Sequence, residues 1–216
     1  LWSIANPTHE RRIGEIIEEE WPDIPYSLSS EIQPIIREYR RTSCVAFDAM
    51  LKPLMRNYTT NLSEALAKHG FEREILTVVS TGGIMLTNEV LAKPVYCLFS
   101  GPAMGPTAGL FFAKQEGIDN CITVDMGGTS FDVSTVINGI PTITRERSIK
   151  TAPESEYPTG VTSIEVLTLG AGGGSIGWVD TGGLLHVGPQ SAGAKPGPAC
   201  YGAGGEEPTV TDANIV

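Results

Sequence analysis

The sequence is poor in cysteine and in basic residues. Cys44, Cys97, Cys121 and Cys200 are widely separated and form no Cys-x-x-Cys pair. This spacing excludes a disulfide-stapled scaffold and a structural zinc framework, and it is typical of a reducing, cytoplasmic location. Only 15 Lys and Arg stand against 25 Asp and Glu, for a formal net charge of -10. Because such a charge opposes binding to the nucleic-acid backbone, we expect no nucleic-acid partner.

Long hydrophobic runs are also scarce. Residues 94–113 form a run of 20 uncharged residues, which is long enough to span a bilayer. Prolines and glycines divide this run into short elements, so we expect it to belong to a folded core and not to a membrane. No basic segment leading into an apolar one follows Leu1, so we expect no signal peptide.

Glycine is nearly absent from the first eighty residues, where only Gly14 and Gly70 occur among the 25 glycines of the chain. Apolar spacing there predicts helices over 9–21 and 42–69, with Pro53 starting a new turn or kinking the second helix. Gly70 is typical of a helix C-cap. We therefore expect a mainly helical region over 1–72 and an α/β nucleotide-binding region over 73–216. The chain opens without Met and closes where a helix is predicted to begin, so we expect a fragment of a longer polypeptide.

The second region alternates between strand and helix patterns. Apolar runs predict strands over 75–79, 95–99 and 120–125, with a helix ending near Gln115. A hairpin of 131–137 with 140–149 is predicted around the turn Asn138-Gly139. This order predicts a mixed α/β sheet.

The strongest local motif is Asp125-Met-Gly-Gly-Thr-Ser-Phe-Asp132. Gly127 and Gly128 allow the backbone to approach a ligand closely, and successive amides can form a site for phosphate oxygens. Thr129 and Ser130 add hydrogen-bond donors. Asp125 stands where it can hold hydrated Mg²⁺ or orient a water. The alternative is a glycine-rich hairpin with a capping Asp.

No P-loop motif and no strand-linked Gly-x-Gly-x-x-Gly motif occurs in the chain. The actin-like, sugar-kinase and Hsp70-like ATPases instead bind phosphate with a strand–turn–strand motif, and the motif of this chain resembles theirs. A second glycine-rich run, Gly170-Ala-Gly-Gly-Gly-Ser175, indicates close approach either of an adenosine or of a neighbouring backbone.

Several unusual strings occur in the order typical of one family. They are His9-Glu10, Leu28-Ser-Ser-Glu31, Arg37-Glu-Tyr-Arg40, Ser100-Gly-Pro-Ala103, Asp125-Met-Gly-Gly-Thr-Ser130, Gly170-Ala-Gly-Gly-Gly-Ser175, Gly188-Pro-Gln-Ser-Ala-Gly193, Pro196-Gly-Pro-Ala-Cys-Tyr-Gly202 and Pro208-Thr-Val-Thr-Asp-Ala-Asn214. Over its whole length the chain resembles the hydantoinase A / 5-oxoprolinase / acetone carboxylase family. The resemblance implies an actin-like ATPase (ribonuclease H-like) fold, in which helices flank a mixed sheet. It also implies that an N-terminal domain with a first phosphate motif lies outside this chain.

The resemblance implies ATP-driven chemistry on a small molecule. Members hydrolyse cyclic amides, and the implied function is the nucleotide-binding portion of a hydantoinase A or 5-oxoprolinase type amidohydrolase, inactive as this fragment alone. Asp125 is then the catalytic residue and the Mg²⁺ ligand, with Asp132 supporting the water shell of the metal. The residues implied to contact ATP are Gly127, Gly128, Thr129 and Ser130 at the phosphates and Gly172, Gly173 and Gly174 at the adenosine. A B-type subunit is the implied partner.

Other functions remain open. The rival within the family is a subunit of an ATP-dependent acetone- or acetophenone-type ketone carboxylase. A non-catalytic nucleotide-binding fragment belongs to a different class, because half of a phosphate clamp is expected to bind ATP weakly. A sugar or acetate kinase relative is a weaker alternative, against which the strings outside the phosphate loop argue.

The remaining candidate residues have mainly structural interpretations. His186 alternates with apolar residues and is expected to be a packed or partly exposed strand residue, not a base. Cys200 lacks a neighbouring His or basic residue, which argues against a nucleophilic thiol. Ser100 suits either a helix cap or an anion site. Lys195 is expected to be solvated, and His9 to serve local structure.

Overall fold

The computed structural model describes residues 2–145, 147–152 and 154–216. They form two compact units: unit 1 comprises the chain up to Met104 together with Ile143–Ile164, and unit 2 comprises Gly105–Thr142 and Glu165–Val216. Unit 1 runs across the division predicted at residue 72, whereas unit 2 lies wholly beyond it. The predicted domain division remains a prediction.

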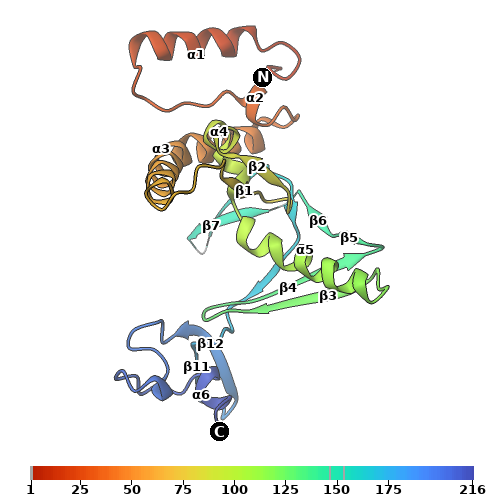
Figure 1. Cartoon of the computed structure of the whole chain (residues 1–216), viewed down its shortest axis with the longest axis vertical. Coiled ribbons are helices and arrows are strands. Elements are labelled where there is room, and N and C mark those ends of the chain that lie inside the picture. Colours follow the sequence, from red (N-terminus) through yellow and green to blue (C-terminus); the bar gives the residue numbers. More distant parts are fainter. Residues whose placement is uncertain (1, 146, 153) are drawn as a thin grey trace. The chain divides into compact units, whose positions relative to one another are not determined.

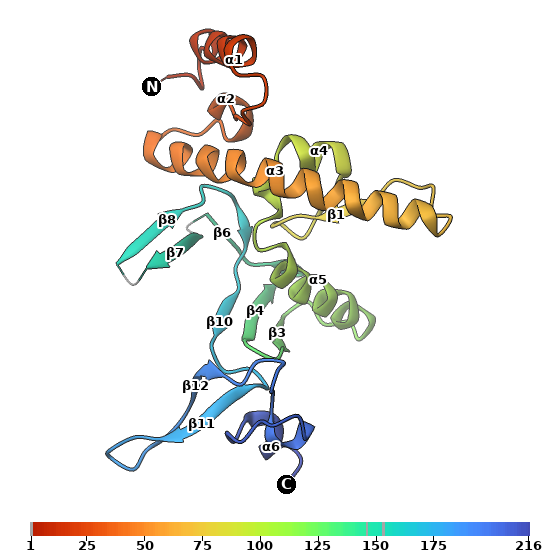
Figure 2. The ribbon, with the colours of Figure 1, turned by 90° about the vertical axis from the view of Figure 1, so that its left-hand side faces the viewer.

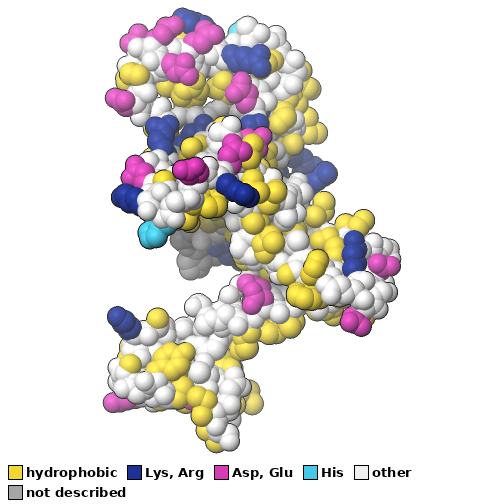
Figure 3. Space-filling model, viewed as in Figure 1, with side chains coloured by type: hydrophobic (Ala, Val, Ile, Leu, Met, Phe, Trp, Pro, Cys, Tyr) yellow, Lys and Arg dark blue, Asp and Glu magenta, His cyan; other side chains and the backbone are white. Residues whose placement is uncertain are grey.

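Unit 1 is built on one long helix. The helices are α1 (Thr8–Glu20), α2 (Ser29–Ile32), α3 (Glu38–Lys68), α4 (Thr87–Ala92) and the 3-10 helix η1 (Pro94–Cys97). The elements α2, α4 and η1 pack against α3 (Figures 1 and 2). Acidic side chains gather on α1, where Glu15, Glu18, Glu19 and Glu20 are exposed, as expected of a solvated face (Figure 3).

The helices α1 and α3 confirm the two predicted ones, although α3 begins at Glu38, earlier than the predicted start at Thr42. At the start of α1, Asn6 Oδ1 accepts a hydrogen bond from Thr8 N at 3.1 Å. At the end of α3, Gly70 has φ +81°, and Phe71 N donates to Leu66 O at 3.1 Å. This left-handed residue satisfies a carbonyl of the last turn, as the predicted C-cap requires. Pro53 lies inside α3, which continues through it.

The strand predicted over 95–99 is wrong, because residues Pro94–Cys97 form η1. Val95 is completely buried in a cluster with Ile32, Cys44 and Val161. Its amide donates to Oδ1 of the buried Asp48 at 3.0 Å, so a side chain replaces the ladder partner that a strand would need. A short apolar run alone does not distinguish a strand from a buried helical turn.

Three two-stranded sheets complete unit 1. They pair β1 (Leu76–Val78) with β2 (Ile84–Leu86), β6 (Ile143–Thr144) with β9 (Ser163–Ile164), and β7 (Ser148–Ala152) with β8 (Ser155–Pro158). The strand predicted over 140–149 is therefore divided among short strands.

Unit 2 contains the main sheet, in the order β10 (Leu167–Leu169), β4 (Phe131–Ile137) and β3 (Cys121–Met126), with β5 (Ile140–Pro141) paired to β4. The predicted Asn138-Gly139 turn is confirmed, since both residues have positive φ. The described residues contain both helices and strands, which confirms the α/β class. Every strand pair in these ranges is antiparallel, so the predicted mixed sheet, which needs parallel pairs, is not observed there.

The remaining elements of unit 2 are α5 (Ser100–Gln115) from Gly105 onward, the hairpin of β11 (Ser175–Val179) and β12 (Leu185–Ser191), η2 (Ala199–Tyr201) and α6 (Val210–Ala213). Thr209 and Asp212 form a capping box at α6, which confirms the predicted helix start. Across the described residues, no helix combines the length and the apolar character needed to cross a membrane.

The backbone of unit 1 makes a close approach at Gly160, which generates a test of the fold. Gly160 has φ +70°, and a Cβ there would lie 3.0 Å from Arg40 O and 3.2 Å from the Cβ of Cys44. We expect Gly160→Ala to lower the free energy of unfolding by about 2–4 kcal/mol, because left-handed strain and overpacking add. Urea denaturation followed by circular dichroism measures this loss.

Gly70→Ala is the matched control, because Gly70 also has positive φ but a Cβ there would meet nothing within 4 Å. We expect Gly70→Ala to lower the free energy of unfolding by about 1–2 kcal/mol, because only the left-handed backbone strain contributes there. Equal losses in the two variants would contradict the close contact at Gly160.

Candidate functional site

The two acidic residues of the predicted phosphate motif face each other across a hairpin. In the register of β3 and β4, Asp125 lies directly opposite Asp132, and Thr168 of β10 lies opposite Asp132 on its other side. Directly opposed residues share one face of a sheet, with Cβ atoms about 5 Å apart. The next row, which contains Val124, Val133 and Leu167, therefore lies on the other face.

The turn between these strands is exposed and leaves several amides available. Gly127 N donates to Ser130 O at 2.9 Å and closes the turn. In the described part of the chain, the amides of Gly128, Thr129 and Ser130 have no hydrogen-bond partner. Successive free N–H groups in an exposed turn can bind an anion such as a phosphate group. The amide of Gly127 is therefore used in shaping the turn.

The second glycine-rich run lies directly against this turn. Gly173 N donates to Gly127 O at 2.9 Å, and Gly174 N donates to Gly128 O at 2.6 Å. A Cβ on Gly172 would lie 2.5 Å from the carbonyl carbon of Thr129. Of the two interpretations of this run, close approach of a neighbouring backbone is therefore the one observed. The contact of Gly172, Gly173 and Gly174 with an adenosine remains a prediction.

A pocket of about 280 Å³ opens between the two glycine loops and the segment that follows β12. The lining residues are Gly128, Thr129, Gly174, Ser191, Gly193, Ala194, Pro198, Tyr201 and Thr211. Thr211 Oγ1 donates to Gly173 O at 2.8 Å, and Gly193 N donates to Ser191 Oγ at 3.2 Å. The lining thus combines hydroxyl groups, glycine backbone and the ring of Tyr201, without a charged side chain.

Sequence reasoning gave no role to Ser191, Tyr201 and Thr211, although each lies in one of the strings that carried the family resemblance. These residues lie near the 127–130 turn only through contacts between segments that are distant in sequence, so sequence reasoning could not identify them. Their side chains add two hydroxyl groups and an aromatic face to the pocket.

The paired carboxylates suit Mg²⁺ and not a metal that needs a dense ligand set. Oδ1 of Asp132 is buried and has no hydrogen-bond partner in the described part of the chain. No group of three or more His, Cys, Asp or Glu among the described residues is arranged to hold a metal ion. Mg²⁺ keeps several waters and takes one or two carboxylates together with phosphate oxygens. The residues present therefore fit it.

His186 is a partly exposed strand residue, as expected. Its Nε2 lies 2.7 Å from Asp180 Oδ2, and its ring stacks on Trp178 with a centroid distance of 4.5 Å. The hydrogen bond with His186 lowers the pKa of Asp180, assisted by the backbone amide of Leu184. Asp180 also accepts a hydrogen bond from Gly182 N, so these groups stabilise the tip of the β11–β12 hairpin.

Cys200 is held as a thiol. Its hydrogen bond to Asp212 raises the pKa of the thiol and lowers that of the carboxyl. A raised pKa disfavours the thiolate, so the argument against a nucleophile stands. Lys195 is exposed, Ser100 begins α5, and His9 lies in the first turn of α1.

Comparisons with known proteins agree with these motifs. The family model described as hydantoinase/oxoprolinase matches residues 41–216. The chain is 44% identical over 215 residues to the caprolactamase subunit alpha of Pseudomonas jessenii, covering 100% of the chain and 30% of that protein. A crystal structure of ATP-dependent caprolactamase from that organism matches with a TM-score of 0.78 at the same identity and coverage.

Two further relatives are similar over the whole chain. The identity is 38% to the acetophenone carboxylase gamma subunit of Aromatoleum aromaticum, of which 30% is covered, and 35% to the 5-oxoprolinase of Saccharomyces cerevisiae, of which 16% is covered. The chain thus spans less than a third of the length of these relatives. Because the family model covers most of the chain and the motifs of both glycine loops meet at one pocket, the chain belongs to the hydantoinase/oxoprolinase family.

Proposed function

We propose that the chain is the nucleotide-binding portion of an ATP-dependent cyclic amidohydrolase. The observation that carries the proposal is the exposed 127–130 turn, whose free amides border a pocket and whose flanking strands carry two opposed carboxylates. An actin-like ATPase fold is part of the proposal, and so is a cytoplasmic location. The similarity to the ATP-dependent caprolactamase, at 44% identity, supports the use of ATP.

In the proposed site, the amides of Gly128, Thr129 and Ser130 bind phosphate oxygens, and the hydroxyl groups of the last two residues add donors. Gly127 fixes the shape of the turn. Asp125 and Asp132 would hold Mg²⁺, which when bound neutralises phosphate charge. Asp125, the more exposed of the two, orients the water or acceptor that approaches the terminal phosphate. Gly172, Gly173 and Gly174 support the turn from behind and line the adenosine.

Phosphoryl transfer would activate the carbonyl group of the proposed substrate. The carbonyl carbon of a cyclic amide is a poor electrophile, and a phosphate on its oxygen is a good leaving group. Preorganised amides and cations stabilise the charge that develops during the transfer. Caprolactamase and 5-oxoprolinase, both amide-hydrolysing by name, support this substrate class.

The similarity to an acetophenone carboxylase subunit supports a second candidate, a ketone carboxylase subunit. A non-catalytic nucleotide-binding fragment is the third. Because two relatives are named as subunits, we also propose a B-type subunit of the same family as a partner.

Gly172 provides a test of the support that the second loop gives to the turn. Any side chain at this position displaces the backbone of Thr129 and Ser130. We expect Gly172→Ala to weaken Mg-ATP binding at least about tenfold and to lower the free energy of unfolding by about 1–3 kcal/mol. Calorimetry and urea denaturation measure the two effects.

Gly105→Ala, at a helical position with nothing within 4 Å, is the control and should leave affinity unchanged. Unchanged affinity in Gly172→Ala would contradict the proposed role.

Asp125 provides a test of the metal. Asp125→Asn should weaken ATP binding about tenfold in the presence of Mg²⁺. In the presence of EDTA the same change should leave ATP binding equal or slightly tighter, because a negative charge near the phosphates is removed. Calorimetry with and without the metal distinguishes these outcomes. Asp119→Asn removes an equal charge from an exposed loop position and serves as the control. If Mg²⁺ strengthens ATP binding equally in the parent chain, in Asp125→Asn and in Asp119→Asn, then Asp125 is not a Mg²⁺ ligand.

The substrate class is tested by turnover in the full-length enzyme that carries this chain, together with its partner subunit. We expect ATP hydrolysis to be stimulated by a lactam, a hydantoin or 5-oxoproline. Stimulation by acetone or acetophenone that also requires bicarbonate would establish the carboxylase instead. Mg-ATP binding without stimulation by either class would favour the non-catalytic fragment.

A further inference from the structure

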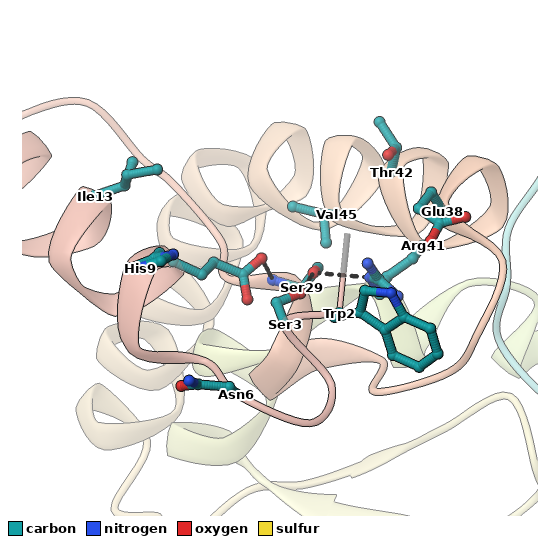
Figure 4. A pocket seen from close by; sticks show the side chains of 11 residues that line it. Trp2, Ser3, Asn6, His9, Ile13, Ser29, Glu38, Arg41, Thr42 and Val45 are labelled. Atoms are coloured by element: carbon teal, nitrogen blue, oxygen red, sulfur yellow. Dashed lines mark hydrogen bonds between the residues drawn. The ribbon is translucent and has the colours of Figure 1, made fainter.

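Unit 1 contains a separate pocket of about 840 Å³, bordered by α1, α2 and α3 (Figure 4). Its lining includes a buried cation, a carboxylate and apolar side chains. The residues that matter here are Ile13, Glu10, Ser29, Arg41, Thr42 and Val45. None of them belongs to the glycine-loop site, and neither the sequence motifs nor the proposed nucleotide chemistry gives this pocket a role.

Arg41 is the unusual group in this pocket. Only 5% of its surface is exposed, and in the described part of the chain no carboxylate lies within ion-pair distance of it. Its Nε donates to Ser29 Oγ at 3.0 Å, as Figure 4 shows, and its Nη1 donates to Ile35 O at 2.7 Å. These two bonds fix the guanidinium and leave three of its five N–H donors free. Because a buried cation normally has a charged or polar partner, the free donors indicate a site for an oxygen acceptor.

Glu10 lies on the other side of Ser29. Its two carboxylate oxygens accept hydrogen bonds from Ser29 N and Ser30 N, each at 2.9 Å. Burial alone would raise the pKa of Glu10, but the hydrogen bonds from Ser29 and Ser30 outweigh it and lower the pKa to about 2. The carboxylate is therefore ionised at neutral pH, and it lines the pocket as a negatively charged acceptor.

The pocket thus presents a donor group, an acceptor group and an apolar wall that includes Val45 and Ile13. We propose that it binds a small cyclic amide, with the carbonyl oxygen at Arg41, the N–H toward Glu10 and the ring methylenes against the apolar wall. A simple carboxylate is disfavoured, because Glu10 and Glu38, which also lines the pocket, repel it. A ketone satisfies Arg41 but supplies no donor for Glu10. This assignment of a binding site for the organic substrate rests on the proposed function.

The test uses the whole 216-residue chain. Binding of ε-caprolactam and 2-pyrrolidinone is compared with that of cycloheptanone and cyclopentanone, which have the same ring sizes and no N–H, by ligand-observed NMR titration. We expect each lactam to bind at least about tenfold more tightly than its ketone, because only the lactam pairs both polar groups of the site. Arg41→Lys, which keeps the charge and loses the planar fork, should weaken lactam binding about tenfold.

Because Arg41 is buried and its replacement can unfold unit 1, a second pair of variants decides independently. Thr42 is exposed and lines the pocket, so Thr42→Phe should fill it and reduce lactam binding at least tenfold. Thr60→Phe places the same side chain at an exposed position of α3 outside the pocket and should bind lactam like the parent. Equal binding of lactams and ketones would overturn the proposal, and so would unchanged lactam binding in Thr42→Phe.

Mg-ATP binding is measured on the same samples. If ATP binds and lactams do not, the lactam site is wrong while the nucleotide site stands. If lactams bind and ATP does not, the pocket in unit 1 is supported and the proposed nucleotide function fails.

Discussion

The hydrogen bonds between the two glycine loops are the constraint on which the candidate site depends. Gly173 and Gly174 donate to the carbonyls of Gly127 and Gly128, so these two carbonyls of the 127–130 turn are paired with backbone. The amides of Gly128, Thr129 and Ser130 take no part in these bonds and remain available. Side chains are excluded from the interface, since a Cβ on Gly172 would overlap the backbone of Thr129. Glycine therefore serves here to let two main chains meet, and the open amides follow from that meeting.

The same arrangement explains why two carboxylates face each other beside the turn. Opposed like charges on neighbouring strands are destabilising by themselves. In the proposed site, a divalent cation held by Asp125 and Asp132 would offset this repulsion. On the proposed function, the binding of metal and nucleotide would then stabilise the sheet relative to the free chain.

Local chemistry made much of this fold predictable. The helix that ends at Gly70, the Asn138-Gly139 turn and the strand–turn–strand motif from Asp125 to Asp132 each follow from residues adjacent in sequence. The segment around Val95 was not predictable, because its conformation depends on Asp48, which is distant in sequence. Likewise, Thr211 joins the pocket through long-range contacts with Gly173, and the burial of Arg41 depends on how three helices pack. Sequence periodicity describes single elements, whereas these features arise between elements.

The pleat of the main sheet has a consequence for how this turn can vary. Asp125 and Asp132 share one face, while Val124 and Val133 share the other. Adding or deleting a single residue between β3 and β4, with pairing re-formed one step along, would exchange the acidic row for the aliphatic one. The number of residues in the turn is therefore more tightly constrained than their identity, and natural variation should accumulate as replacements there and not as changes in length.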